Sequence, residues 1–293
     1  MTDYLTYLHL LTPLHTGGSS QAGNLLGIAR EVHTGFPYLP SSSLRGKIRS
    51  QLEAVEGASI FFGHKIKEGQ QPTEGEVWFA DATLLFFPIA SLSHHLIWIT
   101  CPLWLSRWNR WLPNSPLSEN IATWYETLNK PQESGGKVAF STFETKELYL
   151  QTALLKQDDM DKVGTKTLGE SLPDTVKNDL LTPLLNKLVI LNDEDCAALV
   201  EIGLQREVRV ALQTDAKLVQ GGSFRSEEAI PPEAVLFFPW GMKLSKKEAE
   251  TAQVRAETLK ILGERLQFGG LEGLGQGWAA MNTVPSKMNE VTP

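Results

Sequence analysis

The segment HTGFPYLPSSSLRGKIR, residues 33–49, leads from a turn into an amphipathic helix. Glycine and prolines interrupt its first half, and the serines at 41–43 are typical caps of a helix N-terminus. Apolar residues then recur at helical spacing: Leu44, Ile48, Leu52 and Val55. This pattern predicts a helix whose apolar stripe faces the core.

Strand-like runs lie on both sides of this helix. Residues 4–11 (YLTYLHLL) are apolar on both faces, and residues 75–89 and 95–100 are rich in aromatic and β-branched residues. Apolar and other residues alternate over 206–212, as in a half-exposed strand, and 213–222 could turn this strand into a hairpin.

The C-terminal part predicts one more helix and a closing strand. Ser245 to Glu248 has the form of a capping box. One face of the following helix is expected to consist of Ala249, Ala252, Ala256 and Leu259. A strand–helix–strands–insertion–helix–strand order indicates an α+β protein compatible with a ferredoxin-like fold.

Composition limits the classes of function. The 293-residue chain carries a formal net charge of −7, which argues against indiscriminate nucleic-acid binding, so any RNA surface must be local. Cys101 and Cys196 form no CxxC pair and indicate neither a disulfide framework nor a zinc site. Residues 83–105 lack charged side chains, but prolines, serines and histidines favour two buried strands over a membrane span. A cytoplasmic protein without membrane contact is therefore expected.

The start of the predicted helix is the most basic part of the chain. Residues 30–49 contain four basic side chains and one acidic side chain, a local charge of +3. A helix start with hydroxyls and basic residues can bind phosphate. An ordinary capped helix with a solvated basic face explains the pattern equally well.

A glycine cluster, FGGLEGLGQGW, occupies residues 268–278. It lacks the preceding strand and following helix of a dinucleotide site. Two interpretations stay open: a turn that uses glycine for positive φ, or a loop whose bare backbone approaches RNA closely.

The histidines suggest no metal site, because no HExxH motif or Cys/His spacing suits zinc. His15, at the head of a glycine loop, is the best functional candidate, although a loop-stabilising role is as plausible. His9 alternates with core residues and is expected to be structural. No metal ligands are assigned.

Several blocks together carry a resemblance to a known family: residues 11–18, 30–49, 61–63, 75–92, 98–107 and 206–233, and the terminal glycine loop. In order and spacing they resemble the RAMP superfamily of CRISPR proteins. Within it they are similar to the Cmr-type backbone subunits of type III-B systems, the family of the fourth Cmr protein (a Cas-seven-type fold). The resemblance covers most of the chain outside its middle.

The resemblance implies a ferredoxin-like, RRM-like RAMP core over residues 1–101 and 186–293. A thumb β-hairpin at about 201–232 and a C-terminal Gly-rich loop belong to this core, and residues 102–185 are expected to form an inserted helical lobe. The implied partners are crRNA, target RNA, head-to-tail copies of the same chain, and other type III effector subunits, including the large polymerase/cyclase-type subunit and the small helical subunit.

The resemblance also implies which residues bind RNA. At the N-terminal loops and the helix start they are His15, Gly17, Gly18, Ser19, Arg30, His33, Ser41, Ser42, Ser43, Arg45, Gly46, Lys47 and Arg49. In the thumb they are Arg206, Arg209, Phe224 and Arg225, and in the terminal loop Gly269, Gly270, Gly273, Gly275 and Gly277.

The chain departs from the family at one important position. Active members carry an aspartate that is required to cut target RNA, and Leu25 stands at that position here. A leucine can neither bind a cation nor assist proton transfer. The hypothesis is therefore an RNA-binding subunit that has lost cleavage, with no cofactor and with Mg²⁺ only if cleavage is retained. His15, Glu227 and Glu228 are weak catalytic candidates.

Three alternatives stay open. The first is an active metal-dependent endoribonuclease that cuts target RNA at regular intervals, with another carboxylate in the place of the missing aspartate. The second is a guide-processing endonuclease that uses His15 without metal. The third is a scaffold that binds only protein.

Overall fold

A computed structural model of the chain describes residues 2–18, 21–22, 25–64, 73–172, 181–210, 224–243 and 248–286. Ser19, most of the capping box at 245–248 and the predicted turn at 213–222 lie outside the described residues.

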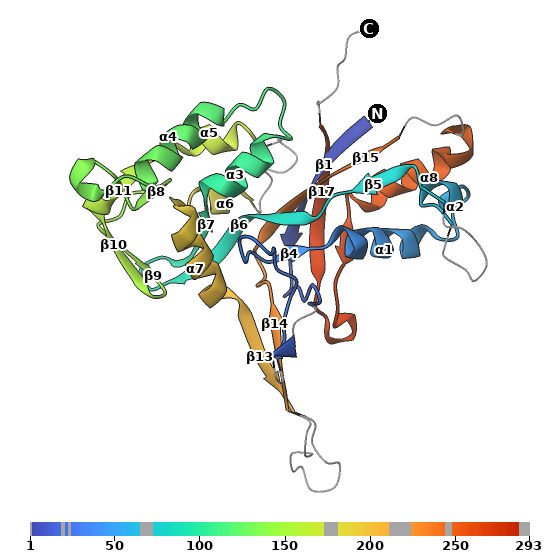
Figure 1. Cartoon of the computed structure of the whole chain (residues 1–293), viewed down its shortest axis with the longest axis horizontal. Coiled ribbons are helices and arrows are strands. Elements are labelled where there is room, and N and C mark those ends of the chain that lie inside the picture. Colours follow the sequence, from blue (N-terminus) through green and yellow to red (C-terminus); the bar gives the residue numbers. More distant parts are fainter. Residues whose placement is uncertain are drawn as a thin grey trace, which may run out of the picture.

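Four long strands form the middle of the molecule, and two helices lie to one side of them (Figure 1). In chain order they are β1 (Thr2–Leu10), α1 (Ser41–Leu52), β6 (Ala82–Ser91), β15 (Val235–Met242), α8 (Glu248–Ile261) and β17 (Trp278–Ser286). The sheet places the strands in the order β6-β15-β1-β17, each antiparallel to its neighbours. This confirms the mixed α and β composition expected from the sequence.

Shorter strands extend this sheet beyond β6 and β17 and pair with the ends of β6 and β15. They are β4 (Tyr38–Leu39), β5 (Val77–Phe79), β7 (His95–Thr100), β12 (Leu188–Leu191) and β16 (Arg265–Gln267). Helix α2 (Ala58–Phe61) packs beside α8, and α7 (Asp193–Gly203) packs against β6.

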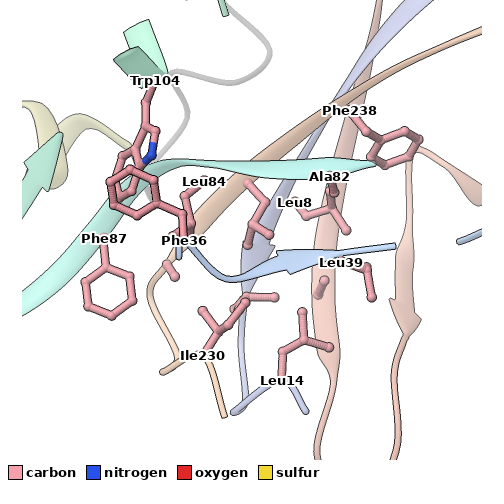
Figure 2. Close-up of a cluster of buried hydrophobic side chains, with 14 of the residues drawn as sticks. Leu8, Leu14, Phe36, Leu39, Ala82, Leu84, Phe87, Trp104, Ile230 and Phe238 are labelled. Atoms are coloured by element: carbon pink, nitrogen blue, oxygen red, sulfur yellow. The ribbon is translucent and has the colours of Figure 1, made fainter. Parts of the chain in front are cut away.

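The two faces of the sheet bury different helices. One face packs against α1 and α8 and contains Leu8, Leu84 and Phe238, which Figure 2 shows in one cluster. Leu44, Ile48 and Leu52 of α1 are buried, as the helical spacing predicts, whereas Val55 follows the end of the helix and packs against the same cluster.

The opposite face is covered by the segment 102–185. Its helices are α3 (Pro102–Asn109), α4 (Ser118–Leu128), α5 (Thr165–Gly169) and α6 (Leu181–Leu185). Trp108 of α3 is fully buried and its Nε1 donates a hydrogen bond of 2.8 Å to the Tyr7 hydroxyl of β1. Burial raises the pKa of that hydroxyl well above its usual value. The tryptophan-rich segment is thus packed on the central sheet.

The same segment also contains strands, which the expectation of a helical lobe did not include. They are β8 (Ala139–Ser141), β9 (Glu147–Leu150), β10 (Ala153–Lys156) and β11 (Met160–Lys162). Strands β8 and β11 join the main sheet through β12, whereas β9 and β10 form a separate ribbon.

The uncharged stretch from Thr83 to Leu105 forms β6, β7 and the start of α3, which agrees with the expectation of two buried strands. Among the described residues, no helix has both the length and the apolar character needed to cross a membrane.

The expected apolar face of α8 was wrong for its three alanines, although Leu259 does pack against the core. Its buried side chains are Thr251, Val254 and Thr258, whereas Ala249, Ala252 and Ala256 are exposed. The Thr258 hydroxyl donates to the Val254 carbonyl oxygen at 2.7 Å. Because this bond satisfies the hydroxyl within the helix, threonine can occupy a core position that its polarity would seem to exclude.

A small second sheet projects away from the main one (Figure 1). It contains β13 (Gln205–Arg209), β14 (Arg225–Ala229), β3 (Leu25–Leu26) and β2 (Gln21–Ala22), in the order β13-β14-β3-β2. The alternation over 206–212 correctly predicted the first of these strands, as far as residue 209. The parallel pairing of β3 with β14 joins segments about two hundred residues apart, which no local pattern predicts.

Candidate functional site

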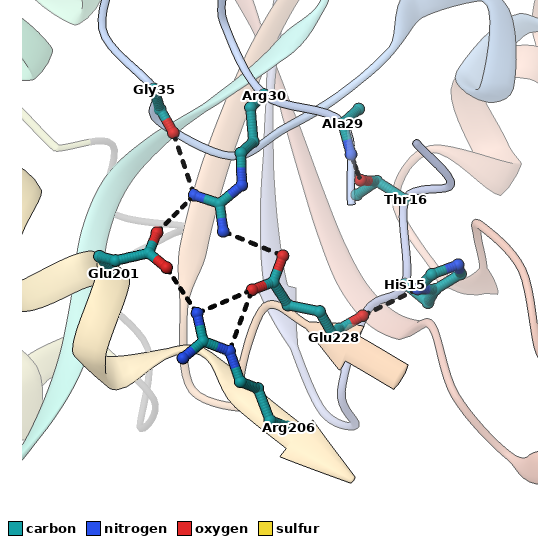
Figure 3. A network of polar contacts seen from close by, with 8 residues as sticks. All are labelled: His15, Thr16, Ala29, Arg30, Gly35, Glu201, Arg206 and Glu228. Carbon is teal, nitrogen blue, oxygen red and sulfur yellow. Dashed lines mark hydrogen bonds and ion pairs between the residues drawn. The ribbon is translucent and has the colours of Figure 1, made fainter. Parts of the chain in front are cut away.

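The base of the projecting hairpin is held by alternating acidic and basic side chains (Figure 3). Arg30 lies 2.7 Å from Glu201 and 2.9 Å from Glu228. Arg206 also pairs with both carboxylates, at 3.1 Å to Glu228. The Glu228 side chain is only 3% exposed. Partial burial acts to lower the pKa of Arg206, but bonds to the two carboxylates outweigh it and raise that pKa.

A second ion-pair group lies around Glu227. The Nε atom of Arg209 lies 2.7 Å from one carboxylate oxygen of Glu227, and that of Arg225 lies 3.1 Å from the other. Arg209 also pairs with Glu207 at 2.7 Å. Thus each of the three thumb arginines predicted to bind RNA already has a carboxylate partner within the chain.

Leu25 lies directly beside this strand. The parallel register of β3 and β14 pairs Leu25 with Ser226 and Leu26 with Glu227. Both leucines are half-buried. Leu25, the position that the resemblance assigns to the family's aspartate, and the weak candidates Glu227 and Glu228 therefore lie in adjoining strands. In the part of the chain that the structure describes, no three His, Cys, Asp or Glu side chains are grouped to hold a metal ion.

His15 connects the hairpin to the terminal glycine loop. Its Nδ1 donates a hydrogen bond of 2.8 Å to the Glu228 carbonyl oxygen, and its own carbonyl oxygen accepts one of 2.8 Å from the Gly270 amide. The side chain is buried. These contacts support the loop-stabilising role for His15.

The glycines of the terminal loop fall into two kinds. Gly269 and Gly277 have φ near +79° and +87°, and a Cβ atom there would lie 2.3 Å and 1.8 Å from carbonyl oxygens of His15 and Phe268. Gly273 and Gly275 have no heavy atom within 4 Å of such a Cβ position. Gly275 also has positive φ, near +79°, so the turn interpretation accounts for Gly269, Gly275 and Gly277, and close approach of another molecule stays open at Gly273.

Helix α1 begins at Ser41, as expected, but no serine caps it. The Ser41 amide donates to a carboxylate oxygen of Asp81 at 2.6 Å, so an acidic side chain lies at the helix start. Asp81 follows a strand and lies forty residues later in the chain, so no local pattern around Ser41 predicts this contact. The hydroxyls of Ser41, Ser42 and Ser43 form no hydrogen bond with any described residue.

The basic residues of α1 contact the protein itself. Arg45 donates to the carbonyl oxygens of Phe62 and Val77, and Arg49 donates to that of Gly63 at 2.9 Å. Burial, and then the charge of Arg49, lower the pKa of Arg45. Lys47 pairs with Glu272 of the glycine loop at 2.9 Å. The basic residues are clustered in the sequence as expected, but these contacts already use many of the N–H groups that could donate to a phosphate.

A groove of about 490 Å³ opens beside the helix start. Its lining includes Ser41, Ser42, Arg45, Trp78, Phe79 and Lys243. The exposed Gly46 lies on the same helix and has open space around it. This groove therefore presents hydroxyls, aromatic rings and cationic groups, together with the carboxylate of Glu74, which pairs with Lys243.

The loop after Arg30 is fixed at its base. Glu31 forms a bidentate pair with Arg107 of α3, at 2.6 and 3.0 Å, while His33 is exposed near the tip.

Gly17 lies in open space with positive φ, but a Cβ atom at Gly18 would lie 2.9 Å from the Ile28 carbonyl oxygen. Sequence reasoning missed Arg107, Asp81 and Glu201, because their partners are far away along the chain.

Known proteins share both the sequence and the architecture. The model of the RAMP superfamily matches residues 7–280. The chain is 28% identical over 298 residues to the CRISPR system Cmr endoribonuclease Cmr4 of Pyrococcus furiosus, covering 100% of this chain and 97% of that protein.

Solved structures of Cmr proteins also resemble this chain over nearly its whole length. The crystal structure of oligomeric Cmr4 from Pyrococcus furiosus has a TM-score of 0.67 at 25% identity and covers 98% of this chain and 99% of that one. A type III-B Cmr-beta structure bound to cognate target RNA has a TM-score of 0.71 at 21% identity, covers 96% of each chain, and shows the fold alone. The resemblance to Cmr-type subunits is thereby confirmed. Because the family model spans nearly the whole sequence, the chain belongs to the RAMP superfamily.

Proposed function

We propose that the chain is a repeated backbone subunit of a type III-B CRISPR effector complex in the cytoplasm. It binds crRNA and the crRNA–target duplex, and it does not cut the target. Its match to Cmr4 along the whole chain supports this role. The β-α-β-β-α-β order and the strand order β6-β15-β1-β17 support a ferredoxin-like core, with β13 and β14 as the thumb.

The proposed subunit assembles with copies of itself, head to tail, and with other type III effector subunits. Oligomeric Cmr4 of Pyrococcus furiosus supports self-assembly. A heterologous contact of this kind repeats along the guide RNA, so each copy needs only one local RNA surface. This arrangement is compatible with a net charge of −7.

The loss of cleavage depends on one observation, Leu25 in strand β3 beside β14. An aliphatic side chain supplies neither a metal ligand nor a proton acceptor. The nearby carboxylates of Glu227 and Glu228 are buried and paired with arginines, which opposes their use as replacement ligands. No cofactor is needed for binding, and Mg²⁺ would matter only if cleavage were retained.

Cleavage of target RNA tests this proposal. A reconstituted complex is expected to leave end-labelled complementary RNA intact in Mg²⁺. Leu25→Asp should then produce fragments at regular intervals, at least about tenfold above the wild-type background, because one positioned acid–base group contributes ~100-fold or more. Leu26→Asp is the matched control, since it places the carboxylate on the other face of β3.

Two results would contradict the proposal. A regular ladder from the wild-type complex, abolished by EDTA, would favour the active endoribonuclease. Cleavage of precursor guide RNA by the isolated chain in EDTA would favour the guide-processing alternative and implicate His15.

We propose that the start of α1 binds the sugar-phosphate backbone of the guide RNA. Ser42→Glu is expected to weaken crRNA binding about tenfold irrespective of guide sequence, because it places a negative charge beside the proposed phosphate position. Ser50→Glu, on the exposed side of the same helix near its other end, is the control. Filter binding with two unrelated guides measures both, and equal affinity of the two variants would exclude Ser42 from the RNA surface.

A further inference from the structure

We propose that Glu74 and Asp81 compete with the phosphates of the guide RNA for two donors beside the start of α1. In the subunit without RNA, these carboxylates occupy the Lys243 ammonium group and the Ser41 amide. Phosphate groups of the guide take their places on binding. This inference rests on the proposed function and adds a regulation of the same surface.

Glu74 is paired with a cationic group of the groove. Its carboxylate forms an ion pair with the Lys243 ammonium group, and both residues belong to the lining of the groove. The hydrogen bond from Lys243, and then its charge, lower the pKa of Glu74, so the carboxylate is ionised near neutral pH. A phosphate that approaches Lys243 therefore meets a lysine that already has an anionic partner.

Asp81 has the corresponding place at the helix. One of its carboxylate oxygens accepts a hydrogen bond of 2.6 Å from the Ser41 amide, the first amide of α1. Amides of the first helical turn have no partner within the helix and carry the positive end of the helix dipole, so they bind carboxylates and phosphates alike. The Asp81 carboxylate thus takes up a donor that a phosphate oxygen could use.

The side chains can exchange partners while the main chain stays in place. The Lys243 amide donates to the Glu76 carbonyl oxygen at 2.7 Å, and its own carbonyl oxygen accepts a bond of 3.0 Å from Arg255. By contrast, the side chains of Glu74 and Lys243 are 84% and 39% exposed, and Asp81 is exposed as well. Exposed ion pairs contribute little to stability because water solvates both partners, so a phosphate can replace Glu74 without disturbing the fold.

The charges around the groove show what the competition achieves. Among the described residues, Arg45 and Lys243 contribute two positive charges, and Glu74 and Asp81 contribute two negative charges. Because these charges balance, a single phosphate gains little by entering the groove. A guide that spans several subunits brings many phosphates at once, and its contacts add up along the chain of subunits. The competition therefore favours a long guide in the assembled complex over short RNA fragments.

Guide binding to the purified full-length chain tests the competition, by filter binding at fixed ionic strength with two unrelated guides. Glu74→Gln is expected to tighten binding about threefold, because an exposed ion pair contributes a factor of this order. Asp81→Asn should act in the same direction. Glu56→Gln is the matched control, since it removes the same charge from an exposed position beyond the other end of α1, and it should change the affinity less than about twofold.

A double-mutant cycle separates exchange at Lys243 from a general effect of charge. In the Lys243→Gln background, Glu74→Gln should no longer tighten guide binding, since no ammonium group is released. A gain that persists in that background, or an equal gain in Glu56→Gln, would overturn the competition at Lys243. If Asp81→Asn lowered the melting temperature without tightening binding, Asp81 would only cap the helix, which would overturn its part in the competition.

The failure of this inference is distinguishable from the failure of the proposed function. If the wild-type chain binds guide RNA and Glu74→Gln and Asp81→Asn bind it equally well, the competition is rejected and the proposed function stands. If neither the wild-type chain nor any variant binds guide RNA, the proposed function itself is rejected.

Discussion

Replacement of Glu228 by alanine is expected to lower the free energy of unfolding by about 3 kcal/mol. The carboxylate is almost fully buried and pairs with Arg30 and Arg206 at the hairpin base. Its removal leaves two guanidinium groups facing each other with only the exposed Glu201 between them, and breaking a buried pair typically costs ~3–5 kcal/mol. Urea denaturation followed by tryptophan fluorescence measures the change.

Glu201→Ala is the matched control, because it removes a carboxylate from the same network at a position where the side chain is 49% exposed. Exposed ion pairs contribute less than ~1 kcal/mol. If the two variants were destabilised equally, burial of Glu228 would not be the source of the effect. Glu228→Gln should lie between them, since it keeps the shape and loses the charge.

Replacement of Gly277 by alanine is expected to destabilise the terminal loop by at least ~3 kcal/mol. The residue adopts φ near +87°, and a Cβ atom would lie 1.8 Å from the Phe268 carbonyl oxygen. The backbone must therefore move, which would break the hydrogen bond of 2.7 Å from the Gly277 amide to the Pro13 carbonyl oxygen. Thermal unfolding and limited proteolysis of the variant measure this loss.

Gly273→Ala provides the comparison within the same loop. Its added Cβ meets no heavy atom within 4 Å, so folding should change by less than about 0.5 kcal/mol. If this loop lies against RNA, Gly273→Ala should nevertheless weaken RNA binding severalfold, because the bare backbone can no longer approach as closely. If the RNA affinity were unchanged, the glycine cluster at 268–278 would serve only to form the turn.

The sequence predicted those elements whose apolar residues repeat with a clear period. Leu44, Ile48 and Leu52 predicted the buried face of α1, and the alternation over 206–212 predicted β13 as far as residue 209. In α8 the same reasoning chose the alanines over Thr251 and Thr258, because a polarity pattern does not show which hydroxyls find partners in the core. The Thr258 hydroxyl donates to the Val254 carbonyl oxygen within the helix, and the Thr251 hydroxyl donates to the Glu76 carboxylate.

The candidate site was predictable only in part. Its residue types and the absence of an aspartate at position 25 were visible in the sequence. Their arrangement was not, because it depends on pairs between distant segments, such as β3 with β14 and Glu31 with Arg107. Basic residues also looked free in the sequence, whereas Arg45 and Arg49 bond to main-chain carbonyl oxygens, a distinction that only packing can make.

These occupied side chains determine what the proposed guide-binding surface can offer to a phosphate. When arginines and lysines contact phosphate, they displace condensed counterions, and affinity then falls steeply as ionic strength rises. Here Arg45, Lys47 and Arg49 already bond within the chain, so in the proposed role the hydroxyls of the serines at 41–43 are left to meet the guide backbone. Each subunit should release few counterions, and the assembled complex should therefore keep its guide in concentrated salt.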